Sequence, residues 1–409
     1  MGGLAALSAV AMTAAACSSS KGTSTSNTTA SHSTSGSGAS QPSGSPIKIG
    51  AICTCSGPLA SETAQTPDIY KAWADSVNAS GGINGHPIQV IVDDDAGNAG
   101  TSITDVHQLV GSQHVVALVD MTDDDETWAS YVQSQNVPVI GSGTSTTPMY
   151  TNPDFYPEAQ TEDALFPSII DAAKGAGATN LALLYCAEAV QCQEGIAPLK
   201  QVGKQLGLPV SYAAQVSATA PDYTAQCVAA QQKHMTAVFI ADTASVANKV
   251  AQNCSQQNYH PIYVIDGESI SPSYTSTPGI KDNLVGPSPN LPYYANTPAI
   301  QAMNQALDKY FPGLRKNASG YTEVASEAWP AGLLFADAAK AGGLGANGST
   351  PTSAQLVKGL ESLKGDTLQG FAPPLTFAAG KPHPVHCWFS FSLKNGTFGL
   401  PKGNSTTCE

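Results

Sequence analysis

The sequence Asn78-Ala-Ser-Gly-Gly-Ile-Asn-Gly-His-Pro-Ile-Gln-Val-Ile-Val-Asp-Asp-Asp-Ala-Gly-Asn98 contains, in order, a helix end, a turn, a strand and an acidic loop. Residues 67–77 before it carry apolar side chains spaced for one helical face. We expect Thr66 to cap this helix and Pro67 to suit its first turn. Gly81-Gly82 permits left-handed backbone at the helix exit. Residues 88–92 then form a short apolar run, which predicts a buried parallel strand.

Strand-like apolar runs alternate with helix-like segments through the rest of the chain. The predicted strands are residues 47–52, 87–93, 115–119 and 137–140, and then 181–185, 210–216, 237–241 and 262–265. The predicted helices are residues 67–77, 103–109, 128–135, 166–173, 300–310, 329–341 and 356–363, with short strand-like pieces between 371 and 391. Such alternation predicts an α/β protein with two successive open parallel sheets, each flanked by helices.

The motif Asn-Ala-x-Gly-Gly-Ile-Asn-Gly, followed by an apolar strand and paired aspartates, resembles the first βαβ unit of the leucine/isoleucine/valine-type periplasmic binding proteins. These are the type I solute receptors of ABC importers. The resemblance implies a two-lobed fold of that type, with a hinge between the lobes that three chain segments cross. It implies that residues 47–162 and 286–365 form lobe 1, and residues 163–285 and 366–409 form lobe 2. The alternative is an ordinary helix–turn–strand unit, which any α/β protein contains.

The N-terminal residues 4–16 are apolar and small, with the length of a secretion-signal core and too short to span a bilayer as a helix. The run ends in Ala-Ala-Ala-Cys17, which resembles a bacterial lipobox and implies that Cys17 is lipidated. The alternative is an Ala-rich leader with an unrelated cysteine. Residues 18–46 are rich in Ser, Thr and Gly and predict a flexible tether. We therefore expect an extracytoplasmic protein held to the outer face of the cell membrane by its lipid alone.

Composition narrows the possible partners. The 409 residues allow two or three domains, and 42% hydrophobic content is enough to build cores. The net charge of −13 disfavours a nucleic-acid partner, which needs a basic face.

The chain has nine cysteines, and eight remain when Cys17 is set aside. An even number in an exported chain predicts disulfides. Proximity in sequence suggests the pairs Cys186–Cys192, Cys227–Cys254 and Cys387–Cys408. Cys53 and Cys55 remain, and a bridge across one residue is geometrically awkward. His383-Pro-Val-His386-Cys387 is the one local His/Cys cluster, but it lacks a second Cys-x-x-Cys, so we expect no metal and no cofactor.

Ligands of open α/β sheets bind beyond the carboxyl ends of the strands, and those ends are rich here in hydroxyls, glycines and carboxylates. The resemblance implies that the loop after residue 140 holds a ligand carboxylate through Ser142, Thr144 and Ser145. It places Thr122 in a second carboxylate-binding loop. A plain Ser/Thr turn with helix capping is the alternative.

An ammonium group on the ligand needs a carboxylate opposite. In Asp266-Gly-Glu268 the resemblance favours Glu268, and Asp242 is a second candidate. Helix capping is the alternative role for these acids. The resembled family also has an aromatic residue near Glu194, where this chain has Cys192; Tyr185 is our candidate for its replacement.

Residues 123–126 are consecutive acids, Asp-Asp-Asp-Glu. One interpretation is that they charge the first turn of the next helix favourably. The other is that they bias the cleft towards a cationic ligand. The acids of Asp93-Asp-Asp95 we interpret as structural.

No hydrolase elbow, zinc-protease motif or phosphate loop is present, so we expect a binding protein and no enzyme. The sequence predicts a receptor that delivers an amino acid or similar small polar ligand to ABC permease subunits by hinge closure. A sensor of the same fold, signalling through a separate membrane partner, is the alternative.

Overall fold

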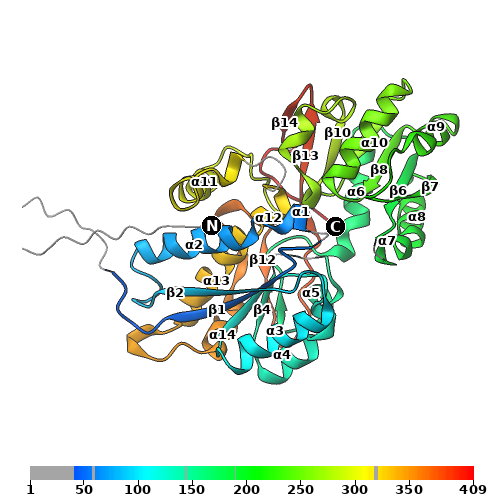
Figure 1. The fold of residues 1–409 in the computed structure, drawn as a ribbon. Helices are drawn as coiled ribbons and strands as arrows, with labels where there is room; N and C mark the ends of the chain where they lie inside the picture. The colour runs from blue at the N-terminus through cyan, green and yellow to red at the C-terminus, as the bar shows by residue number, and fades with distance from the viewer. Residues whose placement is uncertain (1–40, 58–59, 142, 144, 189, 317–320) are drawn as a thin grey trace, which may run out of the picture. The chain divides into compact units, whose positions relative to one another are not determined.

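The computed structural model describes residues 41–57, 60–141, 143, 145–188, 190–316 and 321–409. Cys17, Ser142 and Thr144, which the sequence singles out, lie outside these residues. Residues 39–409 form one compact unit built on two main β-sheets (Figure 1).

The first sheet is parallel and has the strand order β2-β1-β3-β4-β5. Its strands are β1 (Ile47–Cys53), β2 (Ile88–Asp94), β3 (Ala117–Met121), β4 (Val139–Gly141) and β5 (Phe155–Tyr156). In β1, alternate apolar side chains pack against helices on both faces, as expected of a central parallel strand. The carboxyl ends of β1, β3 and β4 therefore meet at one edge of the sheet.

Helices α2 (Thr66–Ala79), α3 (Ala99–Gly111) and α4 (Ala129–Gln135) connect these strands. The prediction that Thr66 caps α2 is wrong. Gln65 occupies the cap position without a side-chain bond, and Thr66 is the first residue inside the helix. Pro67 does lie in the first turn, and Gly81 and Gly82 have φ angles of 101° and 72° as the turn requires.

The second sheet has the order β14-β13-β10-β9-β8-β6-β7, with β15 paired to β13. Its strands are β6 (Leu181–Cys186), β7 (Val210–Val216), β8 (Ala237–Ala241), β9 (Ile262–Val264), β10 (Leu284–Ser288), β13 (Cys387–Lys394), β14 (Thr397–Gly399) and β15 (Thr407–Cys408). Strands β6 to β10 are parallel, and β13 runs antiparallel to β10. The helices connecting this series are α6 (Leu165–Gly175), α7 (Val190–Glu194), α8 (Ile196–Gln205), α9 (Thr224–Gln232) and α10 (Ala244–Gln256).

After β10 the chain returns to the first sheet. Helices α11 (Pro298–Tyr310) and α13 (Ala328–Gly342) pack against α2, and α14 (Ser353–Ser362) packs against α13 (Figure 1). The short helix α12 (Glu323–Ser326) precedes α13, and β11 (Lys364–Asp366) pairs with β12 (Leu375–Thr376). Gly332 of α13 lets the Trp73 ring of α2 approach, because a Cβ there would lie 2.6 Å from ring atoms.

Three connections join the two sheets, namely β5 to α6, β10 to α11 and β12 to β13. Hydrogen bonds tie them together. Thr161 N donates to Val385 O at 3.1 Å, and Asn290 Nδ2 donates to Glu158 O at 3.1 Å. The segments that link the two sheets therefore lie side by side.

Four disulfides form among the residues that the structure describes. Three are the predicted pairs Cys186–Cys192, Cys227–Cys254 and Cys387–Cys408, and the fourth joins Cys53 to Cys55, whose Cα atoms are 5.3 Å apart. The bridge across one residue is thus accommodated, at the end of β1.

The His/Cys cluster near the C-terminus is used structurally. Buried His383 has its ring nitrogens against Phe155 O and Ala378 O, at 3.0 and 3.1 Å. His386 lies 2.7 Å from an Asp163 oxygen, and Cys387 is in a disulfide.

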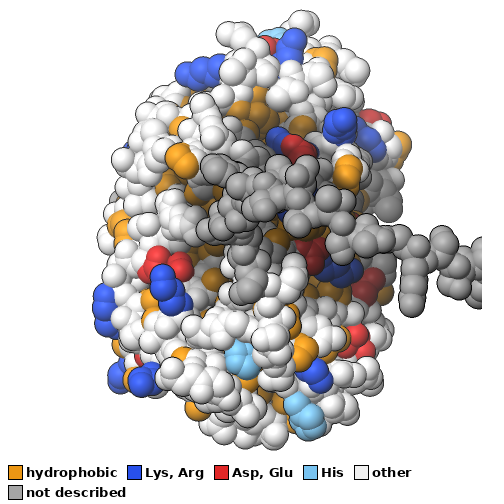
Figure 2. Space-filling view, turned by 90° about the vertical axis from the view of Figure 1, so that its left-hand side faces the viewer, with side chains coloured by type: hydrophobic (Ala, Val, Ile, Leu, Met, Phe, Trp, Pro, Cys, Tyr) orange, Lys and Arg blue, Asp and Glu red, His pale blue; other side chains and the backbone are white. Residues whose placement is uncertain are grey.

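No helix within the described residues is long and apolar enough to cross a membrane. On the described part of the face in Figure 2, Lys and Arg side chains are scattered, several of them beside Asp or Glu, rather than gathered in one basic patch.

Candidate functional site

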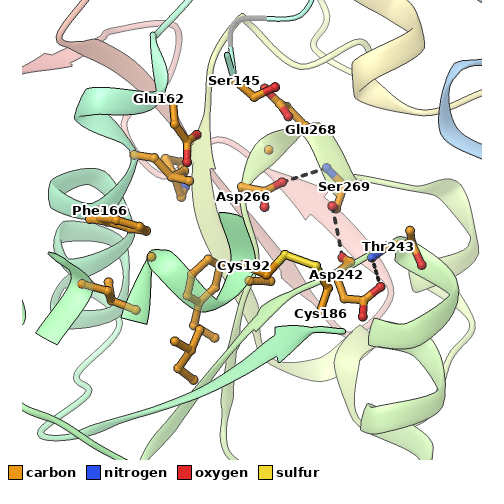
Figure 3. Close-up of a pocket in the computed structure, with 18 of the residues that line it drawn as sticks. Ser145, Glu162, Phe166, Cys186, Cys192, Asp242, Thr243, Asp266, Glu268 and Ser269 are labelled. Carbon is orange, nitrogen blue, oxygen red and sulfur yellow. Dashed lines mark hydrogen bonds between the residues drawn. A yellow bond between two sulfur atoms is a disulfide. The ribbon is translucent and has the colours of Figure 1, made fainter. Parts of the chain in front are cut away.

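A cavity of about 560 Å³ lies where strand ends of both sheets meet (Figure 3). The first sheet contributes Asp123 after β3 and Ser145 after β4. Lining residues that follow strands of the second sheet include Glu188, Ala218, Asp242, Glu268 and Pro289, after β6, β7, β8, β9 and β10 respectively. The connection from β5 to α6 adds Gln160, Thr161 and Glu162. The cavity thus occupies the position where open α/β sheets bind ligands.

The two loops of the first sheet are fixed to each other. Thr146 Oγ1 donates a hydrogen bond of 2.5 Å to Asp125 Oδ2, which joins the loop after β4 to the loop after β3. Asp125 is buried, and this burial raises its pKa to about 7. Ser145 is held at the cavity through its neighbour Thr146.

Thr122 belongs to a buried hydroxyl–carboxylate network behind these loops. Its hydroxyl donates to Asp95 Oδ2 at 2.5 Å, and the Thr54 hydroxyl donates to Asp95 Oδ1 at 2.8 Å. Asp94 accepts hydrogen bonds from the backbone N–H groups of Cys55 and Ser56. These contacts agree with our interpretation that the acids Asp93-Asp-Asp95, at the end of β2, have a structural role.

On the second sheet, Asp266 both lines the cavity and caps a short 3₁₀ turn, η3 (Gly267–Ser269), by accepting from Ser269 N at 3.1 Å. Gly267 fits here because a Cβ would lie 2.7 Å from Pro287 O, where β10 ends. The close approach of the two backbones fixes the position of Asp266 and of Glu268.

Several carboxyl groups of the cavity have raised pKa values. Burial raises the pKa of Asp242 to about 6, against hydrogen bonds from Thr243 that lower it. Burial also raises the pKa of Asp266. Burial first, and then the nearby carboxylates of Glu268, Asp266, Asp163 and Asp123, raise the pKa of Glu162 well above its usual range. Three of these neighbours, Asp123, Asp266 and Glu268, line the cavity together with Glu162.

Glu188 differs from the other acids of the cavity because its pKa is lowered. Burial acts to raise its pKa, but hydrogen bonds from Ser217 Oγ and from the backbone of Ala218 and Ala187 lower it overall. The adjacent disulfide between Cys186 and Cys192 joins the end of β6 to α7 and forms part of the cavity wall (Figure 3).

The remaining wall is apolar and continuous with the core of the second sheet. It is made by side chains from α6, α8, β6 and β8: Leu165, Phe166, Leu183, Leu199 and Phe239. Phe166 points towards the cavity from the start of α6 (Figure 3). The site therefore combines one acidic end with one hydrocarbon wall.

The structure brings together three of the residues singled out from the sequence, since Ser145, Asp242 and Glu268 line the same cavity. Thr122 and Tyr185 are not among its described lining residues. Thr122 is in the network with Asp95, and Tyr185 packs against the apolar core of the second sheet. Of the acids 123–126, Asp123 lines the cavity, whereas Asp125 and Glu126 lie in the first turn of the short 3₁₀ helix η1 (Asp125–Thr127), as the first interpretation has it. The bias towards a cationic ligand stays a prediction.

Sequence reasoning missed Glu162, Phe166 and the place of the Cys186–Cys192 bridge in the wall. Glu162 lies in the connection from β5 to α6 and not directly after a strand of either sheet. The rule that ligands bind beyond strand ends therefore did not select it. The bridge itself was predicted, and its place directly after β6 is the signal that would have located it.

Comparison with known proteins agrees with this architecture. The family model described as periplasmic binding protein matches residues 46–397. The chain belongs to the periplasmic binding protein family. This confirms the resemblance drawn from residues 78–98 and the α/β fold that it implied.

Solved structures of the family share the fold at low identity. The branched-chain amino acid ABC transporter protein of Thermus thermophilus, with bound valine, has a TM-score of 0.75 at 14% identity, covering 89% of this chain and 97% of that chain. The fatty acid ABC transporter substrate-binding protein of Thermomonospora curvata has 0.72 at 16%, covering 89% and 93%. A solute-binding protein of R. palustris in complex with 4-hydroxybenzoate has 0.69 at 15%, covering 89% and 97%. No curated protein matches the chain.

Proposed function

We propose that this protein is the extracytoplasmic solute-binding receptor of an ABC importer, and that it holds an amino acid or a similar small polar compound in the cavity between its two sheets. The observation that carries the proposal is the cavity itself, which is lined from the carboxyl ends of strands in both sheets. Family members with this fold bind molecules as different as valine and 4-hydroxybenzoate. The family alone therefore does not select the ligand.

Hinge closure is the proposed mechanism. The three connections between the sheets lie side by side and are joined by the bonds from Thr161 to Val385 and from Asn290 to Glu158. Rotation about such a bundle would move Asp123 and Ser145 relative to Glu268 without breaking either sheet. A ligand that contacts both sides stabilises the closed form by its extra contacts there. We propose the lobes as residues 47–162 with 286–365, and 163–285 with 366–409.

The test is a thermal-shift screen of the full chain against a library of small metabolites, followed by calorimetry on each hit. A ligand that binds only the folded state raises the melting temperature in proportion to its concentration relative to Kd. Small-angle scattering with a hit should show a smaller radius of gyration than without it. A folded protein that responds to no library member would contradict the receptor function.

Two further expectations concern the partners. Liganded protein should stimulate ATP hydrolysis by its permease complex in liposomes, whereas unliganded protein should not. Cys17→Ala should release the protein from the membrane fraction if the lipid at Cys17 is its anchor. Unchanged membrane association of that variant would count against the anchor and leave solute binding untouched.

A further inference from the structure

We propose that the cavity is selective for an amphipathic cation, a compound with a protonated amine at the acidic end and a hydrocarbon body against the apolar wall, and that recognition requires no carboxylate on the ligand. This inference rests on the proposed function and narrows its ligand class.

All the charged side chains among the described lining residues are acidic. The acids that line the cavity are Asp123, Glu162, Glu188, Asp242, Asp266 and Glu268. None of the described lining residues is Lys, Arg or His. An ammonium group carries three donors and no acceptor, so it is matched by a group of carboxylates. A ligand carboxylate in the same place would face like charges in a partly desolvated site, which is unfavourable.

The four acids at one end act together. Asp123, Glu162, Asp266 and Glu268 all line the same cavity, and each of the other three carboxylates raises the pKa of Glu162. Two of them come from loops of the second sheet, one from the first sheet and one from the connection between sheets. A single cation can therefore contact groups on both sides of the cavity, as hinge closure requires.

The opposite wall fits hydrocarbon. Leu183, Leu199 and Phe239 are each at most 2% exposed yet line the cavity, so the space reaches the apolar core of the second sheet. Phe166 adds an aromatic surface beside them. Each methylene placed against such a wall should strengthen binding about fourfold until the wall is filled.

Among the groups expected to hold a ligand carboxylate, the Thr122 hydroxyl is engaged elsewhere, and Ser142 and Thr144 lie outside the described residues. The Thr122 hydroxyl donates to Asp95, and the Thr146 hydroxyl donates to Asp125. Ser145 is the one hydroxyl of the described part of the loop after β4 that lines the cavity. It lines the same cavity as Glu268, whose carboxylate would repel a ligand carboxylate.

Calorimetry with matched ligands tests the proposal. The first set is phenethylamine, phenylalanine and 3-phenylpropanoate, which share one apolar body and differ in head group. The second set is ethylamine, butylamine and hexylamine. We expect phenethylamine to bind at least about tenfold more tightly than phenylalanine, 3-phenylpropanoate not to bind, and affinity to rise along the alkylamines.

Proton release gives an independent readout. A bound cation favours the ionised form of Asp242, Asp266 and Glu162, whose pKa values are raised in the free protein. Binding at pH 6 should therefore release protons, which is measured as a binding heat that differs between phosphate and Bis-Tris buffers, since both take up protons at this pH with different ionisation enthalpies. A bound carboxylate would instead cause proton uptake.

Substitutions test the acidic end and the apolar wall of the cavity separately. Asp266→Asn removes a carboxylate but keeps an oxygen that can accept from Ser269 N. Glu162→Gln removes a carboxylate with little change in side-chain shape. Each substitution should weaken phenethylamine binding about tenfold or more. Phe166→Ala should reduce the gain along the alkylamines. The matched control is Glu126→Gln, which removes an exposed carboxylate close to the cavity residue Asp123 and outside the described lining; it should leave both results unchanged.

The outcomes separate the two proposals. Tight binding of an amino acid or a carboxylate without amine binding would overturn the amphipathic cation and leave the receptor function standing. Proton uptake on binding, or equal affinity along the alkylamines, would also overturn it. Failure of every ligand and of the metabolite library to bind the folded protein would overturn both.

Discussion

Neutralising Glu323 should flatten the dependence of stability on pH. Glu323 begins α12 and is 1% exposed, and its Oε2 accepts a hydrogen bond of 3.0 Å from Tyr293 N. Burial raises its pKa from 4.5 to about 8, against the lowering effect of the Tyr293 bond. The folded protein therefore keeps a proton that the unfolded chain has already lost.

The sign follows from proton binding. Between pH 4.5 and pH 8 the folded state binds more protons at Glu323 than the unfolded state does, so this group makes stability fall as pH rises. Its contribution is most favourable below pH 4.5 and is lost as pH rises through about 8. From pH 5 to pH 7 the loss is about 2.5 kcal/mol.

Glu323→Gln removes this titration and keeps an oxygen for Tyr293 N. We expect the variant to gain about 2.5 kcal/mol over the wild type between pH 5 and pH 7, measured by urea unfolding with circular dichroism at both values. Glu158, whose pKa burial also raises, has no contribution from Glu323, whereas Glu323 adds to the raised pKa of Glu327; the measured difference therefore reports Glu323 together with its effect on Glu327.

The control is Glu126→Gln, which removes an exposed carboxylate. A Glu323→Gln variant whose stability differs from the wild type by the same amount at both pH values would refute the reasoning.

Three further substitutions test the site and the core. Glu268→Ala should abolish thermal shifts caused by ligands with an amino group, and wild-type affinity in this variant would remove Glu268 from the site. Gly267→Ala places a Cβ 2.7 Å from Pro287 O, so it should displace Glu268 and weaken binding about tenfold, whereas unchanged calorimetry would show that the loop can relax. Gly359→Ala places a Cβ 2.7 Å from the carbonyl carbon of Ala338 where α14 crosses α13, and it should cost about 3 kcal/mol in urea unfolding; a loss below about 1 kcal/mol would contradict the tight crossing.

Local patterns predicted the sheets well, because most of the parallel strands are short, largely apolar segments separated by helix-like or polar ones. The predicted residues 210–216 and 237–241 match β7 and β8 at both ends. The prediction that Thr66 caps α2 failed because the helix begins one residue earlier than the pattern indicated, which leaves Gln65 in the cap position. Such one-residue shifts depend on tertiary packing, which periodicity does not report.

The site was predictable only where strand ends supply it. Ser145, Asp242 and Glu268 follow strands and line the cavity, and their role in binding stays a prediction. Glu162 and Phe166 belong to a connection between sheets, and their place in the cavity depends on how the two sheets are joined. The family resemblance implied how the chain passes between the two sheets. The spacing of hydrophobic residues carries no information about these connections.

The bridge between Cys186 and Cys192 has a consequence for the life of the protein in the cell. A reducing cytosol opposes such cross-links, so a newly made chain there would lack the bond that joins β6 to α7 in part of its cavity wall. The receptor would then become competent only on arrival outside, and would not withdraw metabolites from the compartment that makes it. Oxidation of a single pair of thiols would serve as the maturation step that turns capture on.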